Sequence, residues 1–153
     1  MTSRRIKNGF VLLVFTVMLM ACSSSDDTPA NDNTKSQIET NLKSSTWVIT
    51  KYIDSGVDEL YHYTGYEFTF GDNNVLTATN GTNTISGTWN ISNSSSSSSS
   101  SNDLDFNIFF SSPPDFEELT DDWDILTQTS TKIELIDVSG GSGETDYLTF
   151  ERN

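Results

Sequence analysis

The sequence predicts an all-β domain, folded as an eight-stranded antiparallel up-and-down barrel. After residue 45, apolar and polar side chains alternate in eight short segments, and a period of two residues is typical of strands with one buried face. Most of these segments are separated by short turns, as expected for consecutive hairpins. Closing such a sheet into a barrel would remove its exposed edges.

The first four strands are predicted between residues 46 and 92. The sequence Asn80-Gly81 is typical of a tight hairpin turn and separates the third strand from the fourth. The residues expected on one face of the first strand are Trp47, Ile49, Lys51 and Ile53. The four predicted segments are 46–54, 66–70, 75–79 and 85–91.

The last four strands are predicted between residue 104 and the C-terminus. The dipeptide Pro113-Pro114 follows the first of them as a strand breaker. The apolar alternation in the second predicts that Trp123, Ile125 and Thr127 share a face. The four predicted segments are 104–108, 123–127, 133–135 and 147–151.

Two short helices are predicted beside these strands. Ile38 and Leu42 are four residues apart just before the first strand, which is the spacing of one helix face. The segment "PPDFEELT" between the fifth and sixth strands begins with prolines and acidic residues, as helices often do. Neither helix is expected to exceed about three turns.

The N-terminal segment has the pattern of a secretory signal. Three basic residues precede an apolar run, Phe10–Ala21, which is shorter than the roughly 20 apolar residues of a membrane-spanning helix. Leu19-Met20-Ala21-Cys22 resembles the bacterial lipobox, and this resemblance implies that Cys22 becomes the acylated first residue of the mature chain. Cys22 is the only cysteine, so a disulfide within the chain is excluded. Acyl chains such as palmitate would anchor the protein stably to a membrane.

The expected domain organisation has three parts. Residues 1–21 form the lipoprotein signal peptide, residues 22–35 a disordered tether with almost no apolar side chain, and residues 36–153 the barrel domain. A serine-rich loop at 92–102 is expected inside the domain. The acidic residues of "SSSDD", directly after Cys22, resemble the export tag of surface lipoproteins in Gram-negative bacteria. We therefore expect an outer-membrane lipoprotein exposed at the cell surface.

The charge of the chain excludes nucleic acid as an expected partner. Removal of residues 1–21 takes away Arg4, Arg5 and Lys7 and no acidic residue, so the formal charge becomes −17 instead of −14. A surface of this sign repels phosphate groups. Aspartates cluster on the chain, and they are interpreted as a solvated acidic rim, in preference to a calcium site. The residues of this rim are Asp103, Asp105, Asp121, Asp122 and Asp124.

No enzyme activity, cofactor or metal is expected. His62 is the only histidine, and no serine or cysteine lies at a spacing that indicates a catalytic arrangement. One histidine and one lipidated cysteine also provide too few ligands for a zinc site.

A short helix followed by Trp47 on the first of eight antiparallel strands resembles the lipocalin superfamily, and most closely the short lipocalin-like domains of bacterial lipoproteins. Ser45 replaces the glycine of the usual Gly-x-Trp motif. In lipocalins an arginine near the last strand stacks on this tryptophan. The resemblance therefore implies that Arg152 closes the barrel by a cation–π contact with Trp47.

Two functions remain open for the barrel interior. In the first, the barrel binds a small hydrophobic molecule, and the residues expected to contact it are Lys51, Phe68, Trp89, Phe106 and Ile108. In the second, the same aromatic residues fill a solid core and Lys51 extends to water. The protein would then be a structural or interaction lipoprotein that contacts an envelope partner. Its acidic surface or the segment Asp115–Asp124 would make that contact. An exposed apolar patch at Phe116 and Leu119 would favour this second function, and burial of both against the barrel mouth would count against it.

Overall fold

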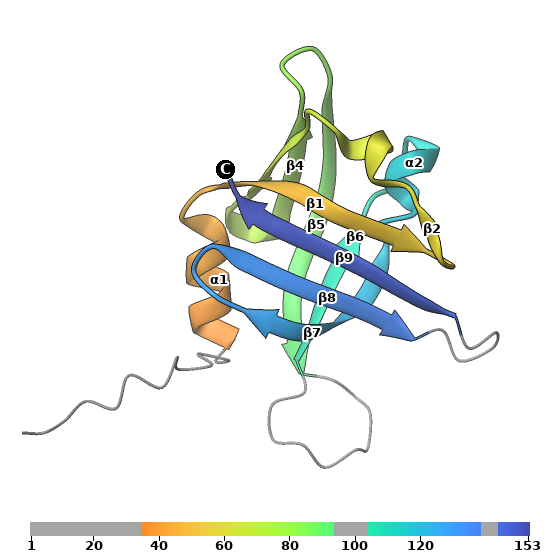
Figure 1. Cartoon of the computed structure of the whole chain (residues 1–153). Helices are drawn as coiled ribbons and strands as arrows, with labels where there is room; N and C mark the ends of the chain where they lie inside the picture. The colour runs from red at the N-terminus through yellow and green to blue at the C-terminus, as the bar shows by residue number, and fades with distance from the viewer. Residues whose placement is uncertain (1–34, 94–103, 139–143) are drawn as a thin grey trace, which may run out of the picture.

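The computed structural model describes residues 35–93, 104–138 and 144–153 (Figure 1). The predicted signal peptide, Cys22 and most of the tether and serine-rich loop lie outside the described residues. The described elements are α1 (Lys35–Lys43), β1 (Thr46–Asp54), β2 (Val57–Asp58), the 3-10 turn η1 (Leu60–Tyr63), β3 (Glu67–Phe70), the 3-10 turn η2 (Asp72–Asn74), β4 (Val75–Thr79), β5 (Thr84–Asn93), β6 (Leu104–Phe109), α2 (Pro114–Glu117), β7 (Asp121–Gln128), β8 (Lys132–Val138) and β9 (Thr145–Arg152).

The strands form a closed antiparallel barrel, which confirms the predicted fold class. From β3 to β9 each strand pairs with the next along the chain. β1 pairs with β3 on one side and with β9 on the other, and this second pairing closes the barrel. The two-residue strand β2 is an addition to the eight, because it pairs only with the end of β1. The predicted helices are also present, and α2 is a single short turn.

A bulge in β1 changes which residues face inward. The register with β9 shifts between Ile49 and Lys51, and an extra residue in a strand reverses the alternation beyond it. Tyr52 is therefore buried, while Lys51 is exposed. The prediction that Lys51 and Ile53 share the inner face of Trp47 is wrong for this reason.

A second bulge lies in β7, between Ile125 and Thr127. Beyond it Gln128 is buried and Thr127 is exposed. The predicted common face of Trp123 and Thr127 is therefore wrong as well, and the cause is again an extra residue in the strand.

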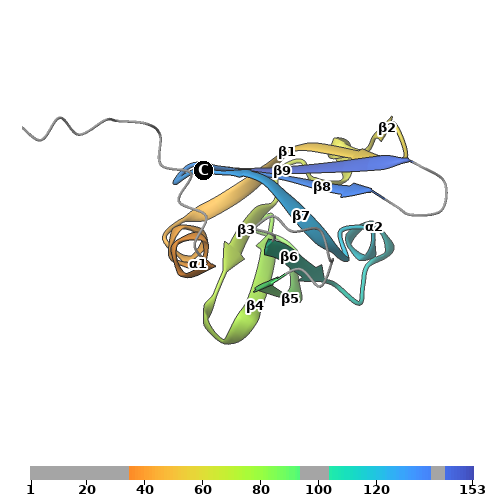
Figure 2. The ribbon, with the colours of Figure 1, turned by 90° about the horizontal axis from the view of Figure 1, so that it is seen from below.

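Two helices cover the opposite ends of the barrel, as Figures 1 and 2 show. At one end α1 buries Ile38 and Leu42, and the Trp47 indole N–H donates to the carbonyl oxygen of Leu42 at 2.9 Å. At the other end α2 buries Phe116, and Leu119 directly after it is also buried. We call these the α1 end and the α2 end.

Candidate functional site

The residues predicted to line a ligand cavity form the core of the barrel. Phe68, Trp89, Phe106 and Ile108 are 0 to 2% exposed. The Phe70 ring lies between them, with its centroid 5.4 Å from Trp89 and 5.5 Å from Phe106. The Trp89 indole N–H donates to the carbonyl oxygen of Gly71 at 3.1 Å. These side chains therefore occupy the space in which a ligand was expected.

Lys51 is not brought together with these residues. Its ammonium group lies on the outer surface, 4.1 Å from the ring centroid of Tyr147. This is the distance of a cation–π contact between neighbouring strands. A role for Lys51 as the counter-ion of a ligand inside the barrel is excluded by this position.

Trp47 and Arg152 lie at the seam where the barrel closes. Their Cα atoms are directly paired between β1 and β9. The guanidinium of Arg152 is exposed and donates a hydrogen bond to Ser44 Oγ. Within the described part of the chain, cation–π contacts are made instead by Lys43 with Trp89 and by Lys51 with Tyr147. Backbone pairing, and not the expected stacking of Arg152 on Trp47, joins the seam.

At the α2 end, polar contacts attach α2 to the barrel. The hydroxyl of Tyr63 donates to the carbonyl oxygen of Asp115 at 2.5 Å, and that of Tyr52 donates to the carbonyl oxygen of Glu118 at 2.8 Å. Burial raises the pKa of both tyrosines, so both hydroxyls remain protonated donors. His62 Nδ1 lies 3.0 Å from the Asp115 carboxylate. The single histidine therefore links η1 to α2.

Phe116 and Leu119 are both buried. Phe116 makes edge contacts with Tyr63, Tyr66 and Phe110. The segment lies across the end of the barrel and turns its apolar side chains inward, which counts against an interaction function that uses these two side chains. Neither side chain can contact a partner in this arrangement.

Carboxylates gather at the same end. Asp54, Glu59 and Glu118 lie within 4.8 Å of one another, close enough for a group of metal ligands. The pKa of Glu118 is raised, first by burial and then by its hydrogen bond with Glu59. Sequence reasoning missed this cluster because its members come from three separate segments.

The predicted solvated acidic rim is wrong for Asp105, whose side chain is buried between neighbouring strands, while Asp122 and Asp124 are exposed. Asp105 and Asp124 are opposite one another on β6 and β7. Burial raises the pKa of Asp121 to about 6. Asp103 lies outside the described residues.

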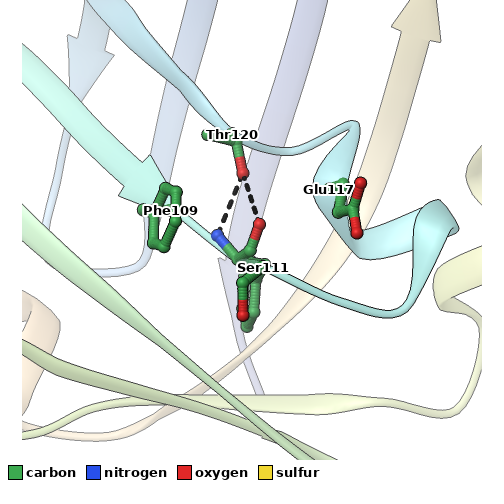
Figure 3. Close-up of a pocket in the computed structure, with 5 residues that line it drawn as sticks. Phe109, Ser111, Glu117 and Thr120 are labelled. Atoms are coloured by element: carbon green, nitrogen blue, oxygen red, sulfur yellow. Dashed lines mark hydrogen bonds between the residues drawn. The ribbon is translucent and has the colours of Figure 1, made fainter.

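A groove beside α2 contains an exposed aromatic side chain. It has a volume of about 380 Å³ and is lined by Phe109, Phe110, Ser111, Glu117 and Thr120. Figure 3 shows Phe109 at the end of β6 and Glu117 on α2, on opposite sides of the groove. The Thr120 hydroxyl accepts from the backbone N–H of Phe110 at 2.9 Å and donates to its carbonyl oxygen at 3.1 Å. Phe109 is 53% exposed.

Two further exposed apolar side chains lie near this end. Val57 in β2 and Tyr61 in η1 are 56% and 67% exposed. The Tyr61 ring packs on the His62 ring with a centroid distance of 4.0 Å. The alternation of Leu104, Phe106 and Ile108 places Phe109 on the outer face, and this was the available sequence signal for the groove.

Comparison with known proteins finds a distantly similar solved structure but no matching family. No family model matches the sequence, and no curated protein matches it. Among solved structures, the chain is similar to the crystal structure of a DUF4847 family protein from Bacteroides vulgatus ATCC 8482. The sequence identity is 18% and the TM-score is 0.48, over 76% of this chain and 97% of that chain. The barrel assignment therefore depends on the strand pairing described above.

Proposed function

We propose that this protein is a lipid-anchored, non-catalytic lipoprotein of the outer membrane, in which a solid lipocalin-like barrel presents a protein-interaction surface. The observation that supports this proposal is the packing of the interior. Phe68, Phe70, Trp89, Phe106 and Phe150 are buried in mutual ring contact. Aromatic pairs at these distances stabilise a core in addition to the area they bury.

The covered ends of the barrel favour this function over transport of a small hydrophobic molecule. A ligand entering from the α1 end would have to displace α1, whose Leu42 accepts the Trp47 hydrogen bond. A ligand entering from the α2 end would have to displace Phe116 and break the hydrogen bonds of Tyr52 and Tyr63. Binding inside the barrel would therefore carry the cost of unpacking buried rings.

The proposed anchor is Cys22, on the sequence pattern that resembles a lipobox. Cells that express the full chain should incorporate labelled palmitate into it and retain it in the membrane fraction. The Cys22→Ser variant should lose both the label and the membrane association. Retention of the label by this variant would contradict the proposed anchor.

The solid core can be tested with tryptophan fluorescence, because Trp47, Trp89 and Trp123 are all buried in the core. The mature chain carrying Cys22→Ser is titrated with palmitic acid and with an apolar fluorescent dye. We expect no saturable change in emission from either probe. A saturable change at one molecule per chain would favour the ligand-binding function instead.

A further inference from the structure

Positive charge is distributed unevenly along the barrel. No lysine or arginine occurs from residue 52 to residue 131. Lys35 and Lys43 belong to α1, while Lys132 begins β8 and Arg152 ends β9. Arg152 is paired with Trp47 at the start of β1, so all four lie at or near the α1 end. Lys51 is the remaining cation of the described residues, and it lies along β1.

The lysines at the α1 end neutralise the acidic groups near them. Lys35 pairs with Glu39 at 3.9 Å, and Lys43 pairs with Asp72 at 3.1 Å. Lys132 lies 2.6 Å from Glu134 and 3.9 Å from Glu151. This end of the molecule therefore presents little uncompensated charge.

The α2 end is acidic. His62 is its basic side chain, and His62 already pairs with Asp115. Carboxylates at this end come from the segment 54–59, from α2 and the residue after it, and from the start of β7. They include Asp54, Asp58, Glu59, Glu117, Glu118, Asp121 and Asp122, and Asp146 accepts from the backbone N–H of Ser55 beside them. A negative field at this end attracts cationic groups over a distance of about 10 Å at moderate ionic strength.

Exposed apolar side chains lie among these carboxylates. Phe109 and Tyr61 both lie close to α2. Phe109 lines the groove with Glu117, and Tyr61 stacks on His62, which pairs with Asp115. Aromatic side chains are enriched at the cores of protein–protein interfaces. The backbone below the groove is held closely, because a Cβ atom at Gly87 would lie only 2.6 Å from the Phe110 ring. The backbone strand that carries Gly87 therefore packs tightly against Phe110, one of the residues that line the groove.

We propose that the α2 end docks a basic polypeptide segment of a partner protein, in which lysines or arginines alternate with apolar side chains. The docking surface consists of Val57–Tyr61, Phe109–Ser111 and Asp115–Asp122. This inference rests on the proposed interaction function and names the class of partner. Charge complementarity selects the partner, and the groove accepts one of its apolar side chains between Phe109 and Glu117.

The position of the surface agrees with this role. The chain enters the barrel through α1, at the opposite end from α2 (Figure 2). An anchor at Cys22 would therefore be attached to the end that does not carry the docking surface. A second copy of the chain is a poor partner, because two copies of this acidic end repel each other and the lysines of the α1 end are already paired.

The test measures peptide binding by the mature chain carrying Cys22→Ser, using backbone amide NMR signals. The probe is the peptide KLKLKLK, with KSKSKSK as the control for charge alone and ELELELE as the control for apolar content alone. We expect KLKLKLK to shift the signals of residues 57–62 and 109–122, with an affinity at least about fivefold higher than that of KSKSKSK. ELELELE should not bind.

Matched variants locate the contact. The double variant Tyr61→Ser with Phe109→Ser should weaken KLKLKLK binding about fivefold or more. Leu126→Ser removes a side chain of similar exposure, 52%, at the bulge of β7, and should leave the affinity unchanged. Both variants replace exposed side chains, so both should fold.

The possible results distinguish a failure of the docking surface from a failure of the proposed solid barrel. Equal binding of KLKLKLK and KSKSKSK, with shifts spread over the whole surface, would overturn the docking surface and leave the solid barrel intact. No binding of KLKLKLK would overturn it as well. Saturable shifts confined to core residues such as Trp89 and Phe106 would contradict the proposed function itself, because they would indicate a site inside the barrel.

Discussion

The two ends of this barrel are both covered by a helix, but by different chemistry. At the α1 end, the cover is a nine-residue helix with lysine–carboxylate pairs around it. At the α2 end, the cover is one helical turn, held by aromatic edge contacts and by two tyrosine hydroxyls that donate to its carbonyl groups. The short turn has little helical stability of its own, so its attachment depends on packing.

The two ends therefore differ in how many of their groups are available to a partner. At the α1 end, the lysines are paired with nearby carboxylates, so few charged groups remain for a partner. At the α2 end, buried aromatic rings and hydrogen bonds to backbone carbonyl groups hold α2 to the barrel. The carboxylates and the Phe109 side chain at this end therefore remain on the surface. The predictions that follow test this contrast, in order of decreasing effect.

The largest effect is expected from removal of the ring that holds α2. Phe116→Ala should lower the free energy of unfolding by about 3–5 kcal/mol, because it empties a site surrounded by four aromatic rings. Leu42→Ala, the matched change in α1, should cost about 2–4 kcal/mol. Urea denaturation measures both. A smaller loss for Phe116→Ala than for Leu42→Ala would contradict the view that packing holds α2.

Gly87 supports the groove by its lack of a side chain. A Cβ atom there would lie 2.6 and 2.8 Å from two ring carbons of Phe110 and would clash with the carbonyl oxygen of Phe109. Gly87→Ala should therefore destabilise the protein by about 2 kcal/mol. Gly71→Ala near η2, where the nearest contact is 3.3 Å, should cost less. Thermal unfolding of the two variants compares the two sites.

The tyrosine hydroxyls should contribute a smaller amount. Tyr63→Phe and Tyr52→Phe each remove a hydrogen bond to a carbonyl group near α2 and should cost about 1 kcal/mol each. Hydrogen exchange should show faster local opening of residues 114–120 in both variants. Unchanged exchange there would mean that the hydroxyls do not hold this segment.

The pH dependence of stability should differ between Asp121 and Glu134. The folded-state pKa of Asp121 is raised from 3.8 to about 6, so the folded protein binds a proton more tightly than the unfolded chain between these values. Its contribution to stability is therefore present at low pH and is lost as pH rises through about 6. After allowance for solvent screening, Asp121→Asn should raise stability above pH 6 by about 1 kcal/mol or less.

Glu134 provides a control because its pKa shifts in the opposite direction to that of Asp121. Its pKa is lowered, chiefly by the hydrogen bond from Lys132. Its contribution is present above the unfolded-state pKa and is lost as pH falls through the folded-state value. Denaturant midpoints measured from pH 3 to 8 should show Asp121→Asn and Glu134→Gln changing the profile in opposite directions. Parallel profiles would contradict the assigned environments.

The smallest effect is expected from the surface ion pair between Lys43 and Asp72. Both side chains are largely exposed, so Lys43→Met should change stability by about 0.5 kcal/mol or less. Added salt should reduce the difference further. Urea denaturation at low and high salt checks this prediction.

Alternation in the sequence was sufficient to predict the barrel, because each strand has one buried face and the turns are short. It failed where the period was interrupted. The bulges after Ile49 and Ile125 reverse the faces of Lys51 and Thr127, and a bulge depends on the register of the partner strand. Local sequence does not contain that register.

The candidate site was less predictable than the fold. The inward positions of Phe68, Trp89 and Phe106 followed from alternation, but whether such residues line a cavity or fill a core depends on how rings from several strands meet. The groove at Phe109 depends on where α2 lies, and α2 is positioned by Tyr63 and by its contacts across the barrel end. These contacts join residues more than fifty positions apart in sequence.

Native mass spectrometry can show whether the interior of the barrel is solid. The mature chain carrying Cys22→Ser is produced in a Gram-negative periplasm and incubated with an envelope lipid extract. It is then weighed under gentle and under denaturing conditions. The account predicts the same mass, that of the polypeptide alone, under both conditions. Additional mass that leaves on denaturation, at one molecule per chain, would contradict it and identify the barrel as a ligand carrier.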